Sequence, residues 1–129
     1  MRVAELVAIY QGLQKIKDKA LPVKVSYAIN RNLKRMTPEV EAFDDSRMNV
    51  VRKYARKKED GSYDADEKGN VQIDDVPACN KEISVLCDSE VTGVEFVKVP
   101  LAELEKCDTA DFDALTVSEM EILDFMIDE

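Results

Sequence analysis

The chain has 129 residues, of which 45% are hydrophobic and 35% charged, with no histidine, no tryptophan and a formal net charge of −9. This length suits one domain, and the apolar fraction allows a buried core. Four glycines and four prolines are too few for an all-β chain, and no apolar run reaches the ~18–20 residues of a membrane span. We therefore expect one mainly helical domain over residues 1–129, with no membrane-spanning segment.

The N-terminal segment predicts an amphipathic helix over about residues 2–18. Val3, Leu6 and Tyr10 are spaced so that they share one face of a helix. Charged residues are interleaved with the apolar ones rather than grouped before them, which is not the pattern of a signal peptide. We therefore expect a cytoplasmic protein.

The second helical pattern is the longest in the chain. Its apolar stripe consists of Val25, Ile29, Leu33, Met36, Val40, Phe43, Val50 or Val51, and Tyr54. The apolar residues stay on the same face of the helix before and after Pro38. The pattern over residues 22–58 therefore predicts either one helix kinked near Pro38 or two nearly collinear helices. A straight helix of this length would span about 55 Å, against a radius of gyration of about 14 Å for a compact chain. The helix therefore bends, or its end projects and meets a partner.

The middle of the chain predicts a small antiparallel β part. Residues 59–75 are dense in turn formers and read as a β-hairpin, with Gly69 supplying a positive φ. A third helix is expected at about 80–90. Residues 92–100 are rich in β-branched residues and predict a strand that could pair with the hairpin.

The end of the chain predicts a last helix over about residues 117–127. Thr116 and Glu119 have the spacing of a capping box, and Met120, Leu123 and Ile127 would share its inward face. The predicted fold is thus α+β and mainly helical. It has four or five helices, one of them long and kinked near Pro38, and a small antiparallel β-hairpin or sheet.

Charge is distributed unevenly along the chain. The predicted helical segment 101–129 holds ten acidic residues and one basic residue, a balance of −9, so residues 1–100 balance to zero. Residues 47–58 hold six basic residues and no acidic one. Either these two segments are solvated and attract each other within the molecule, or they face a partner. The candidate partner-binding residues are Arg47, Arg52, Lys53 and Arg56, together with Asp111, Asp113, Glu119 and Asp124.

The residue types offer little catalytic chemistry. Without histidine the chain lacks the commonest general base and the commonest transition-metal ligand. No glycine-rich phosphate loop and no dinucleotide fingerprint is present. The three cysteines, Cys79, Cys87 and Cys107, form no C-x-x-C pair and are expected to be free thiols that pack as small hydrophobes. We predict no catalytic residue, no metal site and no cofactor, and hence a protein that is not an enzyme.

One stretch partly matches a calcium-binding loop. Asp64, Asp66 and Gly69 occupy positions 1, 3 and 6 of an EF-hand loop. Position 5 is Lys68, however, and position 12 is Asp75 rather than a bidentate glutamate. The pattern therefore favours a hairpin turn.

A further set of residues carries a resemblance to known proteins. The set is Asn30-Arg31-Asn32-Leu33, Glu41-x-Phe43-Asp44-x-x-Arg47, Lys53-Tyr54, Asp60-Gly61 and Gly69-Asn70-Val71. Through these residues, over about residues 20–100, the chain resembles small uncharacterised proteins of tailed bacteriophages and prophages. The resemblance implies a setting in the cytoplasm of a bacterial host, and it carries over no functional residue.

These observations lead to one functional hypothesis and two alternatives. The first is a non-enzymatic phage or prophage accessory protein that binds and modulates a host protein, for example a defence factor. The second is a virion or assembly component that acts through self-association as a homo-oligomer, with other phage proteins as partners. The third is a nucleic-acid mimic or binder. It is disfavoured because Tyr54 is the only aromatic residue in the basic run, whereas single-strand binding uses several stacking residues.

Overall fold

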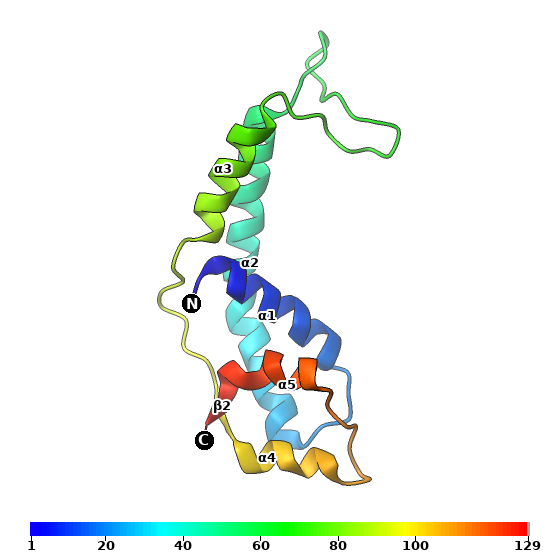
Figure 1. Cartoon of the computed structure of the whole chain (residues 1–129), viewed down its shortest axis with the longest axis vertical. Helices are drawn as coiled ribbons and strands as arrows, with labels where there is room; N and C mark the ends of the chain where they lie inside the picture. The colour runs from blue at the N-terminus through cyan, green and yellow to red at the C-terminus, as the bar shows by residue number, and fades with distance from the viewer. Residues whose placement is uncertain (129) are drawn as a thin grey trace.

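The computed structural model describes residues 1–128, apart from the side chain at position 108, and it is mainly helical (Figure 1). The α-helices are α1 (Val3–Ile16), α2 (Val23–Tyr54), α3 (Val76–Cys87), α4 (Leu101–Glu105) and α5 (Val117–Leu123). Two 3-10 helices, η1 (Lys106–Asp108) and η2 (Asp124–Met126), follow α4 and α5. The strands are β1 (Val99–Pro100) and β2 (Ile127–Asp128). The predicted mainly helical class is confirmed.

Helix α2 is the axis of the molecule. It runs for 32 residues without interruption, with Pro38 inside it, so the long helix predicted from the apolar stripe is confirmed. Figure 1 shows α1, α4 and α5 gathered around its N-terminal half, and α3 alone along its C-terminal half. We call residues 1–39 and 88–128 the body, and residues 40–87 the arm.

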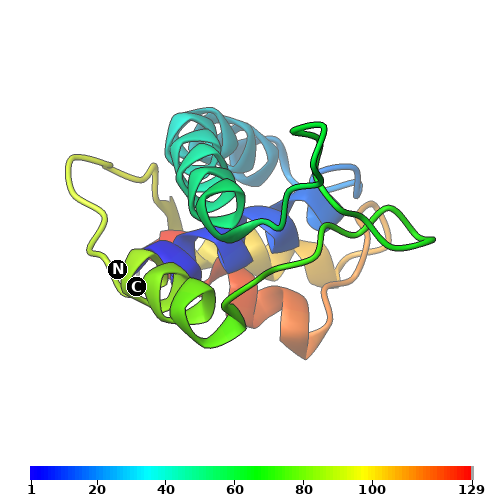
Figure 2. The same ribbon diagram turned by 90° about the horizontal axis from the view of Figure 1, so that it is seen from above.

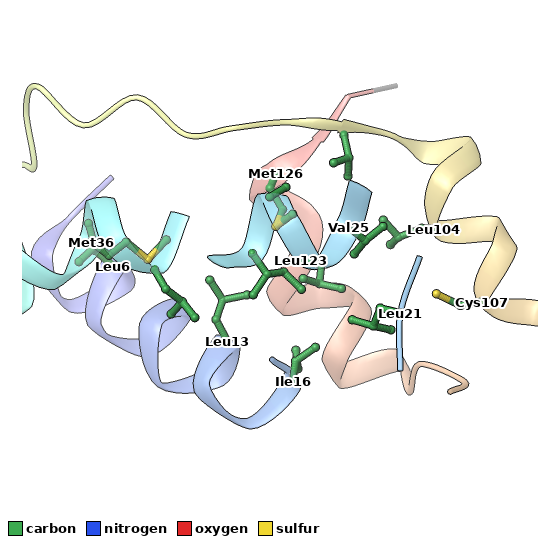
Figure 3. Close-up of a cluster of buried hydrophobic side chains, with 14 residues drawn as sticks. Leu6, Leu13, Ile16, Leu21, Val25, Met36, Leu104, Cys107, Leu123 and Met126 are labelled. Atoms are coloured by element: carbon green, nitrogen blue, oxygen red, sulfur yellow. The ribbon is translucent and has the colours of Figure 1, made fainter. Parts of the chain in front are cut away.

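The buried core lies in the body. It combines apolar side chains from α1, α2, β1, α4, η1, α5 and η2, many of which are labelled in Figure 3. Its members are Leu6, Leu13, Ile16, Leu21, Val25, Ala28, Ile29, Leu33, Met36, Val99, Leu104, Cys107, Leu123 and Met126. In the arm only Cys79 joins the buried hydrophobic residues among those that the structure describes. The stripe of α2 is therefore fully covered in its first half and half-covered in its second.

A buried amide fixes the extended segment that returns from α3 to β1. The side chain of Asn32 is fully buried. Its Nδ2 donates to the carbonyl of Val97 at 2.9 Å, and its Oδ1 accepts from the amide of Val97 at 2.7 Å. One side chain thus satisfies both backbone groups of a residue that packs against the core, as a neighbouring strand would.

The predicted antiparallel β part is wrong. The strands that the structure describes form one two-stranded parallel sheet, in which Val99 pairs with Ile127. Residues 55–73 are joined only by isolated antiparallel bridges around turns at Gly61 and Gly69, both of which have positive φ. Figures 1 and 2 place this loop and the segment 92–98 on opposite sides of the molecule, too far apart for the pairing that we expected.

Local capping explains where two of the helices begin. Helix α3 starts at Val76, earlier than expected, because the Asp75 carboxylate accepts a hydrogen bond from the amide of Ala78 at 3.1 Å. Helix α5 starts as predicted, since Thr116 and Glu119 form both hydrogen bonds of a capping box.

The last helix ends sooner than predicted, and one of its apolar side chains is exposed rather than buried. Helix α5 stops at Leu123, after which η2 leads the chain into β2 beside β1. Leu123 and Met126 therefore fill the core, whereas Met120 remains 49% exposed. The expected inward position of Met120 is wrong, and the residue faces a groove instead.

Candidate protein-binding site

Two of the six basic residues in the run 47–58 are paired within the arm, and the run continues past the end of α2 at Tyr54. Lys53 Nζ lies 2.8 Å from Glu82 Oε1 on α3, and Arg56 Nε lies 2.8 Å from Asp74 Oδ1. The hydrogen bond to Glu82 raises the pKa of Lys53, and the same bond lowers the pKa of Glu82. Residues 59–75 add seven acidic residues and one basic residue next to the run in sequence. The positive charge of the run is therefore partly offset within the arm.

The two remaining basic candidates, Arg47 and Arg52, lie on α2 away from these pairs. Arg47 is half-buried and Arg52 is exposed. Within the part of the chain that the structure describes, neither forms an ion pair. Arg52 lines a small apolar pocket of about 210 Å³ together with Met48, Val51, Ala55, Tyr63 and Val71.

Two of the acidic candidates hold the body together. Asp113 Oδ2 accepts from the amide of Ala20 at 2.7 Å, and Glu119 Oε1 lies 2.7 Å from Lys19 Nζ. The bond to Lys19 and the capping bond to Thr116 lower the pKa of Glu119. Both carboxylates therefore join the end of α1 to the start of α5. The other two acidic candidates, Asp111 and Asp124, are exposed.

The basic run and the acidic segment do not meet. The C-terminal end of α2 and helices α4 and α5 lie at opposite ends of the molecule in Figure 1. Among the side chains that the structure describes, no ion pair joins residues 47–58 to the segment that starts at residue 101. An internal attraction between the two segments therefore does not shape the fold.

An apolar groove lies between α4 and α5. It has a volume of about 410 Å³ and is lined by Leu101, Leu104, Val117, Met120, Glu121, Asp124 and Ile127. A smaller pocket of about 90 Å³ shares Leu101, Leu104 and Met120, so it extends the groove beneath η1. Three of the apolar lining side chains are well exposed, with Leu101 at 43%, Val117 at 74% and Met120 at 49%.

The rim of this groove is acidic. Glu105, Glu121 and Asp124 are exposed lining residues of the groove and its extension. The two lysines on the α4 side, Lys24 and Lys106, are both paired with Glu103, at 3.6 and 3.0 Å. The three rim carboxylates form no ion pair in the described residues, so their negative charge is directed to solvent. We call these three carboxylates and the groove between them the acidic groove.

Sequence reasoning found only Asp124 of this site. Leu101, Val117, Glu105 and Glu121 were missed because each helix is short and the two helices are distant in sequence. A signal was present: Leu101–Leu104 and Val117–Met120 are apolar pairs at helical i, i+3 spacing, each followed directly by a glutamate.

Other chemistry is not brought together in the described part of the chain. No group of three or more histidine, cysteine or acidic side chains is placed to hold a metal ion there. In the loop that partly matches a calcium site, Asp66 Oδ1 accepts from the amides of Lys68 and Asn70, both at 2.9 Å. Cys79 and Cys87 are free thiols, and Cys79 and Cys107 are buried. Among residues 1–128, no helix has the length and hydrophobicity needed to cross a membrane.

The sequence matches no protein family and no curated protein, and the structure matches no solved structure.

Proposed function

We propose that this protein is a non-enzymatic accessory protein that binds another protein through the acidic groove and thereby modulates that partner. The observation that carries the proposal is the set of exposed apolar side chains Leu101, Val117 and Met120 around a concave surface with an unpaired acidic rim. Concave apolar surfaces with a few polar groups at their edge are where partners bind most often. The resemblance to phage and prophage proteins makes a protein of the bacterial host the partner to seek.

A charge-reversal experiment tests this proposal. The full chain and its Glu105→Lys/Glu121→Lys/Asp124→Lys variant are each immobilised and used to capture proteins from a lysate of the bacterial host. We expect a protein that is bound by the parent chain and lost by the variant, because complementary charge steers and orients association. The activity of that purified protein should then change when the parent chain is added.

A matched control separates the groove from overall charge. The Glu41→Lys/Glu59→Lys/Glu67→Lys variant makes the same change in net charge on three exposed residues of the arm. It should capture the same protein as the parent chain. Capture that survives reversal of the groove, or that is lost equally in both variants, would rule out the acidic groove as the binding site.

A second candidate function is an assembly component that associates through the arm. The observation in its favour is the apolar pocket beside Arg52, where Met48 and Tyr63 are 36% and 40% exposed. Light scattering on the purified chain tests it. A stable oligomer that persists at high salt and dissociates in a Met48→Gln/Tyr63→Ser variant would favour self-association, whereas a monomer at all concentrations would exclude it.

A further inference from the structure

The acidic groove has a length, a lining and a charge that together define the segment that would fill it. We propose that it accepts one amphipathic α-helix of the partner protein, with its apolar face in the groove and lysine or arginine residues on its flanks. This inference rests on the proposed function, and it adds the chemical nature of the segment that is recognised.

The dimensions of the groove suit a short stretch of helix. Its longer wall is α5, whose seven residues span about 10 Å. A docked helix would therefore contact the groove over about two turns, through residues at positions i, i+3 or i+4, and i+7. An aromatic or aliphatic side chain at each of these positions would bury the exposed surfaces of Leu101, Val117 and Met120.

The lining of the groove also favours apolar side chains. Leu104 is 7% exposed and forms part of the floor, while Ile127 of β2 is half-buried at one end. Met120 stands between the groove and its smaller extension. A methionine side chain adapts to differently shaped partners, because it is unbranched and flexible. Helical ligands with different apolar side chains could therefore be accommodated.

The charge of the rim selects the flanks of the helix. Among the described residues Glu105, Glu121 and Asp124 form no ion pair, and the nearby Lys24 and Lys106 share the single carboxylate of Glu103, so the three negative charges of the rim exceed the one lysine charge that Glu103 leaves uncompensated. A helix with basic flanks would supply the missing cations, whereas an acidic helix would place like charges side by side. The groove is therefore specific for cationic amphipathic helices.

The buried helices of a second copy do not provide such a helix. Leu6 and Leu13 of α1 are 1% and 0% exposed, and Ile29 and Met36 in the first half of α2 are 1% and 0% exposed. Either helix would have to leave its own core before it could dock.

The second half of α2 carries basic residues and the exposed Met48, so docking of the arm of a second copy is the competing outcome that the experiment below separates. We take the occupant to be a helix of another protein, because Val51 and Tyr54 on this half of α2 are already half-buried and Lys53 is paired with Glu82.

Synthetic helices test the inference. The full chain is titrated with a fluorescently labelled peptide of about 18 residues, built from leucine and lysine so that the leucines fall on one face of a helix. Two control peptides are used: the same composition in scrambled order, and the same pattern with glutamate in place of lysine. We expect the amphipathic cationic peptide to bind at least about tenfold more tightly than the scrambled one, and the acidic one not to bind.

Isosteric variants then locate the binding. Val117→Thr/Met120→Gln removes apolar contacts from the groove without changing charge, and both side chains are exposed, so folding is preserved. Val76→Thr/Val85→Thr likewise replaces two exposed apolar side chains of the arm by polar ones without changing charge. The groove variant should bind the cationic peptide about tenfold more weakly than the parent chain does. The arm variant should bind the peptide with the same affinity as the parent chain. Amide chemical-shift changes on binding should centre on Leu101 and Ile127.

Several outcomes would overturn the inference. Equal binding of the ordered and scrambled peptides would mean that charge alone attracts them, and shift changes centred on α3 would place the site in the arm. Self-association of the chain that the peptide displaces would make a second copy the occupant. If the peptide fails to bind but the groove charge reversal still abolishes capture of the host protein, the helix inference fails while the proposed function stands. If capture survives that reversal, the proposed function itself fails.

Discussion

The body and the arm share one helix but are packed in different ways. In the body, α2 is covered by α1, α4, α5 and the extended segment before β1, and its side chains at Val25, Ala28 and Met36 are 0–1% exposed. In the arm the same helix is covered mainly by α3 and the loop, and its larger apolar residues are half-buried except for Met48, which is exposed. Since hydrophobic stabilisation scales with the area removed from water, the body provides most of the stability of the fold. The arm is the part most able to open locally.

The largest expected effect is a leucine truncation in the body. Leu13→Ala removes a fully buried side chain from the centre of the core and should lower the free energy of unfolding by about 4 kcal/mol. The same change in the arm, Leu86→Ala, affects a half-buried side chain and should cost about 1 kcal/mol. Urea unfolding measures both. Equal costs would show that the arm is packed as tightly as the body.

The buried amide of the body should have the next largest effect. Asn32→Ala leaves both backbone groups of Val97 without their partner and should cost about 3 kcal/mol in the free energy of unfolding. Asn30→Ala, at an exposed position of the same helix, is the control and should change stability by less than about 0.5 kcal/mol. Hydrogen exchange should show faster exchange of the Val97 amide in the first variant. An unchanged rate would mean that another group protects this amide.

A smaller effect is expected where α1 and α5 come closest. A Cβ added at Gly12 would lie 2.7 Å from Cδ1 of Ile122, closer than side chains pack. Gly12→Ala should therefore cost about 1 kcal/mol, because overpacking exceeds the gain in helix propensity. Adding Ile122→Val removes the clashing methyl group and should restore stability toward that of the parent chain. If the double variant is no more stable than Gly12→Ala alone, the close contact is not the cause.

The smallest effect is a change in how stability depends on pH. The folded pKa of Glu119 is lowered by Lys19, below the unfolded value of about 4.3. Its stabilising contribution is therefore present above that pH and is lost as the pH falls through the folded pKa. Glu119→Gln should be less stable than the parent chain at neutral pH and should lose less stability on acidification. Thermal unfolding between about pH 3 and pH 7 measures both effects, and an acid-induced loss of stability as large in Glu119→Gln as in the parent chain would contradict this role of Glu119.

The sequence predicted the features that depend on neighbouring residues. The periodic stripe at Val25, Ile29 and Leu33 indicated α2, and the pairing of Thr116 with Glu119 indicated where α5 begins. It failed where the outcome depends on distant residues. Val94–Lys98 has β-type composition, yet its partner is the side chain of Asn32 rather than a strand, and no local pattern contains that contact.

The candidate site was predicted only in part for the same reason. The acidic character of residues 101–129 was evident, but charge counts do not distinguish carboxylates that bind internally from those that face solvent. Asp113 and Glu119 are held by Ala20 and Lys19, which lie more than ninety residues away. Asp124 follows directly after α5 and lines the groove with Glu121, and its exposure could not be read from a charge count.

The attachments of the return segment also determine where the chain tolerates changes in length. The segment is held at its start by the bridge between Arg2 and Glu90, and near its end by the hydrogen bond from Arg35 to the carbonyl of Glu95 and by the two hydrogen bonds to Val97. Residues 92–94 between these points belong to no helix or strand, and Gly93 among them already has a positive φ. Insertions at Gly93 should therefore extend an exposed loop without shifting the register of β1. This position is suited to accept an inserted tag or an entire foreign domain.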